Sequence, residues 1–278
     1  MSDSPVILVT GSSSGIGKAC ALRLAASGFR VFGSARSAPR LQDIRHGSKG
    51  DPFTQLFMDV RDESSVNEGI SWVLKEASCI DVLVNCAGVA VGGPAEEMLM
   101  EEIQDQIETN LLGTIRTCRA VLPGMRTRKS GLIINVGSLA GLMGVAFQSA
   151  YSASKYGIEG YSESLQMEVY GFGVRVVIID PGDVQTEFTT HRKETRGSLK
   201  DSPYRRNLDA ALHSQAASEL HGWKVERIAR LVERIVRSRS PRFRYTPGPF
   251  IERIAPTLRR MIPDRLFLSI LRRFYGVK

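Results

Sequence analysis

The sequence predicts an α/β protein built on a doubly wound parallel sheet, with helices on both faces in a three-layer αβα arrangement. Apolar runs without polar alternation occur at residues 6–9, 82–84, 132–136 and 174–179. Such runs are typical of strands that are covered on both faces. Amphipathic stretches separate these runs, and a glycine-rich turn follows the first of them. Alternation of strand and helix along the chain favours parallel pairing with right-handed crossovers.

Length and composition predict a single domain that spans residues 1–278. The chain has 278 residues, of which 42% are hydrophobic and 24% charged, so it can bury a sizeable core. We find no internal repeat and no low-complexity segment.

The first strand and the glycine-rich turn predict a dinucleotide site. The segment VILVTGSSSGIGKACALRLA reads as strand, turn and helix. Gly11 permits a tight turn, Gly15 allows the backbone to approach a pyrophosphate, and Gly17 allows the helix to pack against the strand. The N-terminus of the helix then offers free N–H groups to the phosphates. The expected architecture is therefore a Rossmann-type fold.

A basic residue after the second strand predicts the cofactor. Folds that use NAD place an acidic side chain at the end of this strand, where it accepts hydrogen bonds from the ribose. Here Arg36 follows V-F-G-S-A, and the next acid is Asp43. A guanidinium suits a 2′-phosphate, and Ser14 can add a hydroxyl donor, so we expect NADP(H). An Arg36 that is solvated or stacked on the adenine is the alternative.

Tyr151 and Lys155 predict a pair of residues that transfers a proton to or from the substrate. In a helix over residues 150–170 their i, i+4 spacing places both side chains on one face. An adjacent ammonium lowers the pKa of a phenol toward neutrality, as a general acid needs. Ser138, thirteen residues before Tyr151, would orient the substrate oxygen. Any helix can carry this pair by chance, so the interpretation depends on its context.

That context resembles a known family. T-G-x-x-x-G-x-G, then N-x-A-G, a serine and Y-x-x-x-K occur in this order between residues 6 and 188, a pattern similar to the short-chain dehydrogenase/reductases. The segment GSLAGLMGVAF through YSASKYGIEGY most resembles the branch of the 17β-hydroxysteroid dehydrogenases and retinol dehydrogenases. Cys86 departs from the family, which usually has a second asparagine there.

The resemblance implies site residues by position. Asn110 matches the asparagine that supports a water-linked proton path to the lysine, and it joins Ser138, Tyr151 and Lys155 as the catalytic set. The implied cofactor-binding residues are Thr10, Gly11, Ser13, Ser14, Gly15, Ile16, Gly17, Arg36, Asp59, Val60, Asn85, Ala87, Gly88, Tyr151, Lys155, Pro181, Gly182, Val184 and Thr186. In the family Lys155 would also hold the nicotinamide ribose.

A long polar excursion over residues 188–222 predicts a substrate loop or lid, with an ordinary surface insertion as the alternative. Together with apolar residues after the Ser138 strand it could enclose a bulky substrate. The expected substrate-binding residues are Ser138, Leu142, Met143, Val145, Tyr151 and Phe188.

Residues 247–278 predict a basic, amphipathic C-terminal helical extension. Of the net charge of +8, the segment 223–278 carries fifteen Lys and Arg against four Asp and Glu. After a last strand near residues 242–246 we expect a Pro-rich connection and then a helix from Pro263. Its apolar face comprises Ile262, Leu266, Phe267, Ile270, Leu271 and Phe274, and its polar face Arg265, Ser269, Arg272 and Arg273. This apolar face either packs on the protein or a partner subunit, or contacts an anionic membrane peripherally.

Other features narrow the class of protein. The chain shows no nucleic-acid-binding motif despite its positive charge, no cluster of Cys and His for a metal, and no apolar run that could span a bilayer. Four scattered cysteines without paired spacing favour a reduced, cytoplasmic protein. The family resemblance implies a homodimer or homotetramer.

These expectations together describe an NADPH-dependent reductase of a ketone or aldehyde. The substrate is expected to be hydrophobic, such as a steroid, a retinoid or a keto-lipid. Two alternatives stay open from the sequence. One is an NAD-dependent alcohol dehydrogenase that runs oxidatively, and the other is a catalytically silent protein of the same fold that binds a nucleotide or a lipid.

Overall fold

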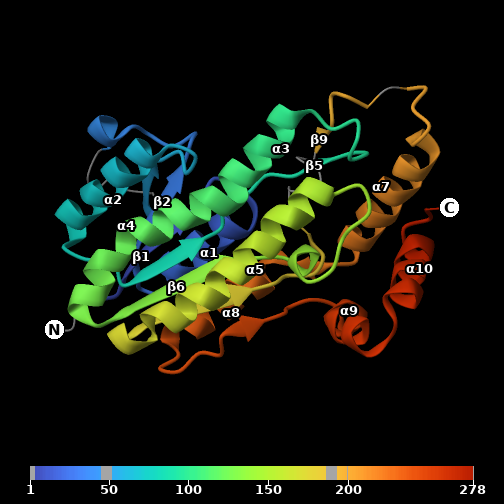
Figure 1. The fold of residues 1–278 in the computed structure, drawn as a ribbon. Coiled ribbons are helices and arrows are strands. Elements are labelled where there is room, and N and C mark those ends of the chain that lie inside the picture. Colours follow the sequence, from blue (N-terminus) through green and yellow to red (C-terminus); the bar gives the residue numbers. More distant parts are fainter. Residues whose placement is uncertain (1–3, 45–51, 186–192, 199, 278) are drawn as a thin grey trace.

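A central parallel sheet organises the structure, a computed structural model that describes residues 4–44, 52–185, 193–198 and 200–277. In these residues seven strands pair in the order β11-β7-β6-β4-β1-β2-β3, all parallel (Figure 1). The strands are β1 Val6–Thr10, β2 Arg30–Ala35, β3 Thr54–Phe57, β4 Val82–Asn85, β6 Gly131–Val136, β7 Val174–Ile179 and β11 Arg244–Tyr245. The predicted doubly wound sheet is confirmed.

The strand order places a crevice above β1. Strand β1 pairs with β2 on one side and with β4 on the other, so the chain reverses its direction of winding at this point. Ligands in open α/β sheets bind outside the carboxyl ends of the strands at such a switch point. The turn at Gly11 and the segment after Asn85 both begin at these ends.

Helices cover both faces of the sheet (Figure 1). One buried cluster joins the sheet to α2 Glu63–Ala77, α4 Gly113–Arg128 and α5 Ser149–Val169, and the other joins it to α1 Gly15–Ala26 and α8 Val225–Arg237. Helix α3 Met100–Gln106 continues through a π-helical turn, Ile107–Leu112, into α4. Short helical turns lie at Leu41–Asp43, Leu139–Gly141 and Tyr170–Phe172. The three αβα layers are those expected.

Two separate two-stranded parallel sheets involve the later segments. Strand β5 Val91–Gly92 pairs with β9 Lys193–Glu194, and β8 Val184–Gln185 pairs with β10 Trp223–Lys224. Helix α7 Arg205–Leu220 occupies the second half of the polar excursion between β8 and β10. The sequence showed its polarity and length but not this helix.

The C-terminal extension has two helices, α9 Phe250–Met261 and α10 Asp264–Phe274. The expected Pro-rich connection before Pro263 is therefore wrong. Pro256 stands inside α9, where it lacks the N–H that would bond the Glu252 carbonyl, yet the helix continues through it. Ala255 of α9 packs against the cluster of Leu139, Met143 and Phe267. Phe267 of α10 is 3% exposed and contacts Leu139 and Met143.

Candidate active site

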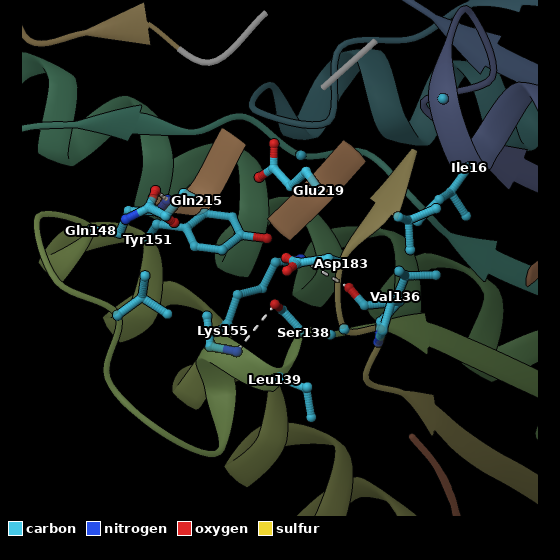
Figure 2. A pocket seen from close by; sticks show the side chains of 18 of the residues that line it. Ile16, Val136, Ser138, Leu139, Gln148, Tyr151, Lys155, Asp183, Gln215 and Glu219 are labelled. Carbon is cyan, nitrogen blue, oxygen red and sulfur yellow. Dashed lines mark hydrogen bonds between the residues drawn. The ribbon is translucent and has the colours of Figure 1, made fainter. Parts of the chain in front are cut away.

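One cavity of about 810 Å³ joins most of the residues that the sequence singled out. Its walls include the glycine loop from Gly11 to Gly17 at one end and the apolar residues of α9 and α10 at the other. The side chains of Ser138, Tyr151 and Lys155 line the part between them (Figure 2). A dinucleotide and an apolar ligand would therefore meet at these three polar groups.

The glycine loop fits a pyrophosphate because its backbone approaches its neighbours closely. Gly11 has φ +66°, and a Cβ there would lie 2.7 Å from the Cα of Ala87. A Cβ on Gly17 would lie 2.2 Å from the carbonyl oxygen of Gly11, so only glycine lets α1 begin this close to the turn. The N-terminus of α1 at Gly15 opens onto the cavity, which suits a phosphate.

The end of the cavity at which the adenine is expected is lined by residues predicted from the sequence. Arg36 is exposed, follows β2 directly and lines the cavity with Asp59 and Val60. Asp59 accepts hydrogen bonds from Arg61, which hold the pKa of this carboxyl below its usual range. The guanidinium of Arg36 thus stands at the rim of the cleft, within reach of a ligand, and its positive charge also acts on Asp59.

Lys155 is buried beneath the cavity. Its ammonium donates a hydrogen bond of 2.9 Å to the carbonyl oxygen of Val136 and lies 5.7 Å from the centroid of the Tyr151 ring. Burial lowers the pKa of Lys155 to about 8, against the opposing effect of the negative charge at Asp180. Lys155 and Tyr151 stand one turn apart in α5, so the predicted common face is present.

Ser138 stands at the end of β6, where it caps a short helical turn. Its hydroxyl oxygen accepts a hydrogen bond of 3.1 Å from the backbone N–H of Ala140. The hydroxyl proton is therefore available to donate into the cavity that Ser138 lines.

Asn110 lies behind the cavity wall rather than in it. Its side-chain amide exchanges hydrogen bonds with the backbone of Val89, at 2.8 and 3.0 Å, and donates to the hydroxyl of Ser154. Ser154 in turn donates to the Tyr151 carbonyl. A π-helical turn often marks a functional site, and here it sets Asn110 between the loop after β4 and α5. Asn110 thus joins the loop after β4 to α5, and its expected place in the catalytic set stays a prediction.

Three other expected residues do not line the cavity. The Thr10 hydroxyl accepts hydrogen bonds from the backbone N–H groups of Cys86 and Ala87, so it shapes the turn opposite Gly11. Asn85 is buried and bound to Asn135 and Thr117, which braces neighbouring strands and α4. Leu142 packs beside Met143, away from the cavity surface.

The remaining expected residues have the following positions. Gly88, Val145, Pro181, Gly182 and Val184 line the cavity, as do Ser13, Ser14 and Ile16. Thr186 and Phe188 lie outside the described residues, as does part of the predicted 188–222 segment.

Sequence reasoning missed a polar wall contributed by α7. Gln148 donates a hydrogen bond of 2.5 Å to Gln215, which donates to the Ala146 carbonyl. Ser218 and Glu219, one turn further along α7, also line the cavity, and Figure 2 shows the Glu219 carboxylate in the same view as the Tyr151 phenol. No local pattern could reveal this wall, because Gln215 follows Gln148 by 67 positions.

A second missed element links the extension to the segment after β7. The Glu252 carboxylate of α9 accepts a hydrogen bond of 2.8 Å from the backbone N–H of Asp183. Burial and the nearby Asp183 raise the pKa of Glu252 to about 7. Arg259 donates to the Leu142 carbonyl at 2.7 Å, so α9 is attached to the cavity at two points.

Comparison with known proteins identifies the class. A model of the family described as short chain dehydrogenase matches residues 5–197. The chain belongs to the short-chain dehydrogenase/reductase family and is an oxidoreductase of a family that uses NAD or NADP.

Individual relatives agree with this class. The chain is 34% identical to a 3-ketodihydrosphingosine reductase from Bacteroides thetaiotaomicron over 274 residues, 98% of both chains. It is 31% identical to retinol dehydrogenase 8 from Bos taurus over 266 residues, 89% of this chain and 85% of that protein. The expected likeness to retinol dehydrogenases is thus confirmed.

Solved structures agree as well. A short-chain dehydrogenase from Streptomyces avermitilis superposes with a TM-score of 0.79 at 29% identity and covers 97% of both chains. A serine dehydrogenase in complex with NADP+ superposes with a TM-score of 0.73 at 30% identity and covers 88% of this chain and 94% of that chain.

Proposed function

We propose that this protein reduces the ketone of a long-chain amino lipid to an alcohol with NADPH. The observation that carries the proposal is the single cavity in which the glycine-loop cleft meets an apolar compartment at Tyr151. NADPH supplies the hydride for such a reduction. The cleft residues Gly11, Gly15 and Lys155 would hold the dinucleotide along the carboxyl ends of the strands.

The reaction steps that belong to the chain concern the carbonyl oxygen. Ser138 donates a hydrogen bond to this oxygen and fixes its direction. The Tyr151 hydroxyl donates the proton that completes the alcohol, and the ammonium of Lys155 stabilises the phenolate that remains. The hydrogen bonds of Asn110 to Val89 and Ser154 support this arrangement by holding α5 against the loop after β4.

The choice of NADPH is supported by charge at the adenine end. Arg36 lines this end of the cavity, and Asp59 is already bound by Arg61. A forked guanidinium favours a 2′-phosphate over a bare ribose hydroxyl. The relative from Escherichia coli named NADP-dependent 3-hydroxy acid dehydrogenase, 35% identical over 220 residues, supports the same choice.

The apolar compartment supports a long-chain substrate. Aliphatic and aromatic side chains of the extension surround it, namely Phe250, Ile254, Ala255, Leu258, Phe267, Ile270, Leu271 and Phe274, with Met143 and Val145 opposite. Among the steroid, retinoid and keto-lipid classes, the keto-lipid is favoured by the relative named 3-ketodihydrosphingosine reductase, which matches nearly the whole chain.

The polar wall supports an amine next to the ketone. Dihydrosphingosine is a long-chain base, so its 3-keto form carries an ammonium beside the reacting carbon. Glu219 brings a carboxylate to the cavity that Tyr151 lines, and a carboxylate binds an ammonium through a charge-assisted hydrogen bond.

The direct test is NADPH consumption with 3-ketodihydrosphingosine, a ketosteroid and retinal as substrates. We expect turnover of the amino ketone in preference to the other two. Preference for the steroid or for retinal would reject the substrate class, and turnover only in the oxidative direction with NAD would reject the cofactor as well.

A further inference from the structure

The C-terminal helices carry a surface that differs from the rest of the protein. Nine of the seventeen large apolar side chains that are exposed in the described residues lie on α9 and α10. They are Phe250, Ile251, Ile254, Leu258, Met261, Leu266, Leu268, Ile270 and Phe274. Single exposed apolar residues are ordinary, but a cluster on two adjacent helices marks an interaction site.

The apolar residues of the extension divide between two directions. Phe267 and Tyr275 are 3% and 7% exposed and pack on the body of the protein. Met261, Leu266 and Leu268 are 77%, 52% and 58% exposed, and none of them lines the cavity. On α10, Leu266 and Leu268 lie on opposite flanks of the outward face that carries Arg265, Arg272 and Arg273. Packing within the chain thus accounts for the inner face only and leaves the outer face uncovered.

Positive charge accompanies the exposed apolar residues. Between residues 250 and 274 the chain has six arginines, Arg253, Arg259, Arg260, Arg265, Arg272 and Arg273, against the acids Glu252 and Asp264. All but Arg259 of these arginines are exposed, whereas Glu252 is half-buried in its contact with Asp183. The surface therefore presents apolar and cationic groups together.

This combination fits an anionic lipid surface. Helices that lie in the membrane interface insert an apolar face among the acyl chains and place Arg near anionic headgroups. The two helices have 12 and 11 residues, too short to cross a bilayer. No helix in the described part of the chain is long and apolar enough to do so.

The surface lies next to the mouth of the cavity. Ile270 and Phe274 of α10 are exposed and also line the cavity, so they stand at its mouth. Figure 1 shows α9 and α10 at one end of the molecule, with α10 beside α7. A bilayer that contacted the outer face of α10 would meet the opening through which an apolar ligand enters.

We propose that the outer face of α9 and α10, comprising Met261, Leu266, Leu268 and the exposed arginines, binds an anionic membrane surface peripherally. Contact there places the mouth of the cavity against the lipid phase. Membrane binding needs neither cofactor nor substrate, so it can be tested independently of the proposed reaction.

The test is co-sedimentation of the full chain with vesicles, without cofactor or substrate. We expect binding to vesicles of phosphatidylcholine with phosphatidylglycerol at about 0.1 M salt, weaker binding at higher salt, and weaker binding to phosphatidylcholine alone. The double variant Met261→Ser/Leu268→Ser should bind at least about tenfold more weakly. Met167→Ser is the matched control, since Met167 is 70% exposed on α5 and remote from the extension, and it should bind like the parent.

Charge reversal provides an independent variant set. Arg260→Glu/Arg265→Glu should reduce binding to the anionic vesicles by about tenfold or more, while Arg126→Glu on α4 should leave it unchanged. All these positions are exposed, so the variants should keep the melting temperature of the parent. Absence of vesicle binding, or equal losses in the extension and control variants, would overturn the proposal. A dimer in light scattering that Met261→Ser/Leu268→Ser dissociates would assign the face to a second copy instead and would overturn it too.

Discussion

The ammonium of Lys155 lies 5.7 Å from the centre of the Tyr151 ring and is held there by the carbonyl oxygen of Val136, 2.9 Å away. Because Val136 ends β6 and both other residues belong to α5, this relationship depends on the packing of α5 against the sheet. Its consequence is a positive charge, fixed in a buried position, next to the group that we propose as the proton donor.

Removal of the Tyr151 hydroxyl should abolish most of the activity. Tyr151→Phe keeps the ring but has no proton to donate, so turnover should fall by at least about a hundredfold. The dissociation constant for NADPH should change little, since the glycine loop is untouched. Tyr170→Phe, at an exposed position just after α5, is the control and should behave like the parent. Parental turnover by Tyr151→Phe would refute the assigned role.

Titration of Lys155 should appear in the pH dependence of the rate. The pKa of Lys155 is about 8, because burial disfavours its charged form. As the pH rises through about 8 the positive charge is lost, and the reduction rate should decline. A profile of kcat/KM between about pH 6 and 10 measures this limb. A rate that stays level across this range would contradict the role of the ammonium.

The same titration should raise stability in the same range. The ordinary pKa of a lysine is 10.5, so between about pH 8 and 10.5 the unfolded chain binds more protons than the folded one. The contribution of Lys155 to the free energy of unfolding therefore increases with pH across this window. The free energy of unfolding, measured by urea denaturation at about pH 8 and about pH 10.5, should increase between these pH values in the parent and increase less in Lys155→Met. Identical slopes in the two proteins would show that Lys155 is not perturbed.

Exchange of the charge at Arg36 should alter cofactor preference. We propose that Arg36 binds the 2′-phosphate. Arg36→Asp replaces its positive charge by a negative one that repels a phosphate, so the dissociation constant for NADPH should rise at least about tenfold relative to that for NADH. Arg40→Asp makes the same change at an exposed position that does not line the cavity. A parent protein that prefers NADH would reverse the cofactor assignment.

Loss of charge at Glu219 should affect one substrate class only. Glu219→Gln should raise KM for 3-ketodihydrosphingosine about tenfold, because a charge-assisted hydrogen bond to the ammonium is lost. The KM for the corresponding ketone without the amine should not change. Glu168→Gln, at an exposed position of α5, serves as control. Equal changes for both ketones would show that Glu219 does not recognise the amine.

The sequence could predict those parts of the protein that depend on local patterns. The buried strands, the glycine loop and the Tyr151–Lys155 face all follow from periodicity or spacing within about twenty residues. The structure confirms the sheet and places Arg36, Ser138, Tyr151 and Lys155 on one cavity.

The parts that the sequence could not predict depend on distant contacts. The hydrogen bond between Gln148 and Gln215 joins residues 67 positions apart, and that between Asp183 and Glu252 joins residues 69 apart. Pro256 indicated a break, whereas α9 continues through this position and is joined to distant segments by Glu252 and Arg259. Asn85 and Asn110 carry the expected motif but are turned toward buried partners, which spacing alone does not reveal.

In the proposed reaction a ketone carbon receives hydride beside Tyr151 and Lys155. The most direct measurement is mass spectrometry of the alcohol formed from 3-ketodihydrosphingosine with NADPH that carries deuterium at both C4 positions. The parent should form an alcohol with one deuterium at carbon 3, and Tyr151→Phe should form it at least about a hundredfold more slowly. An alcohol without deuterium, or no alcohol from the parent protein, would contradict the proposed reaction.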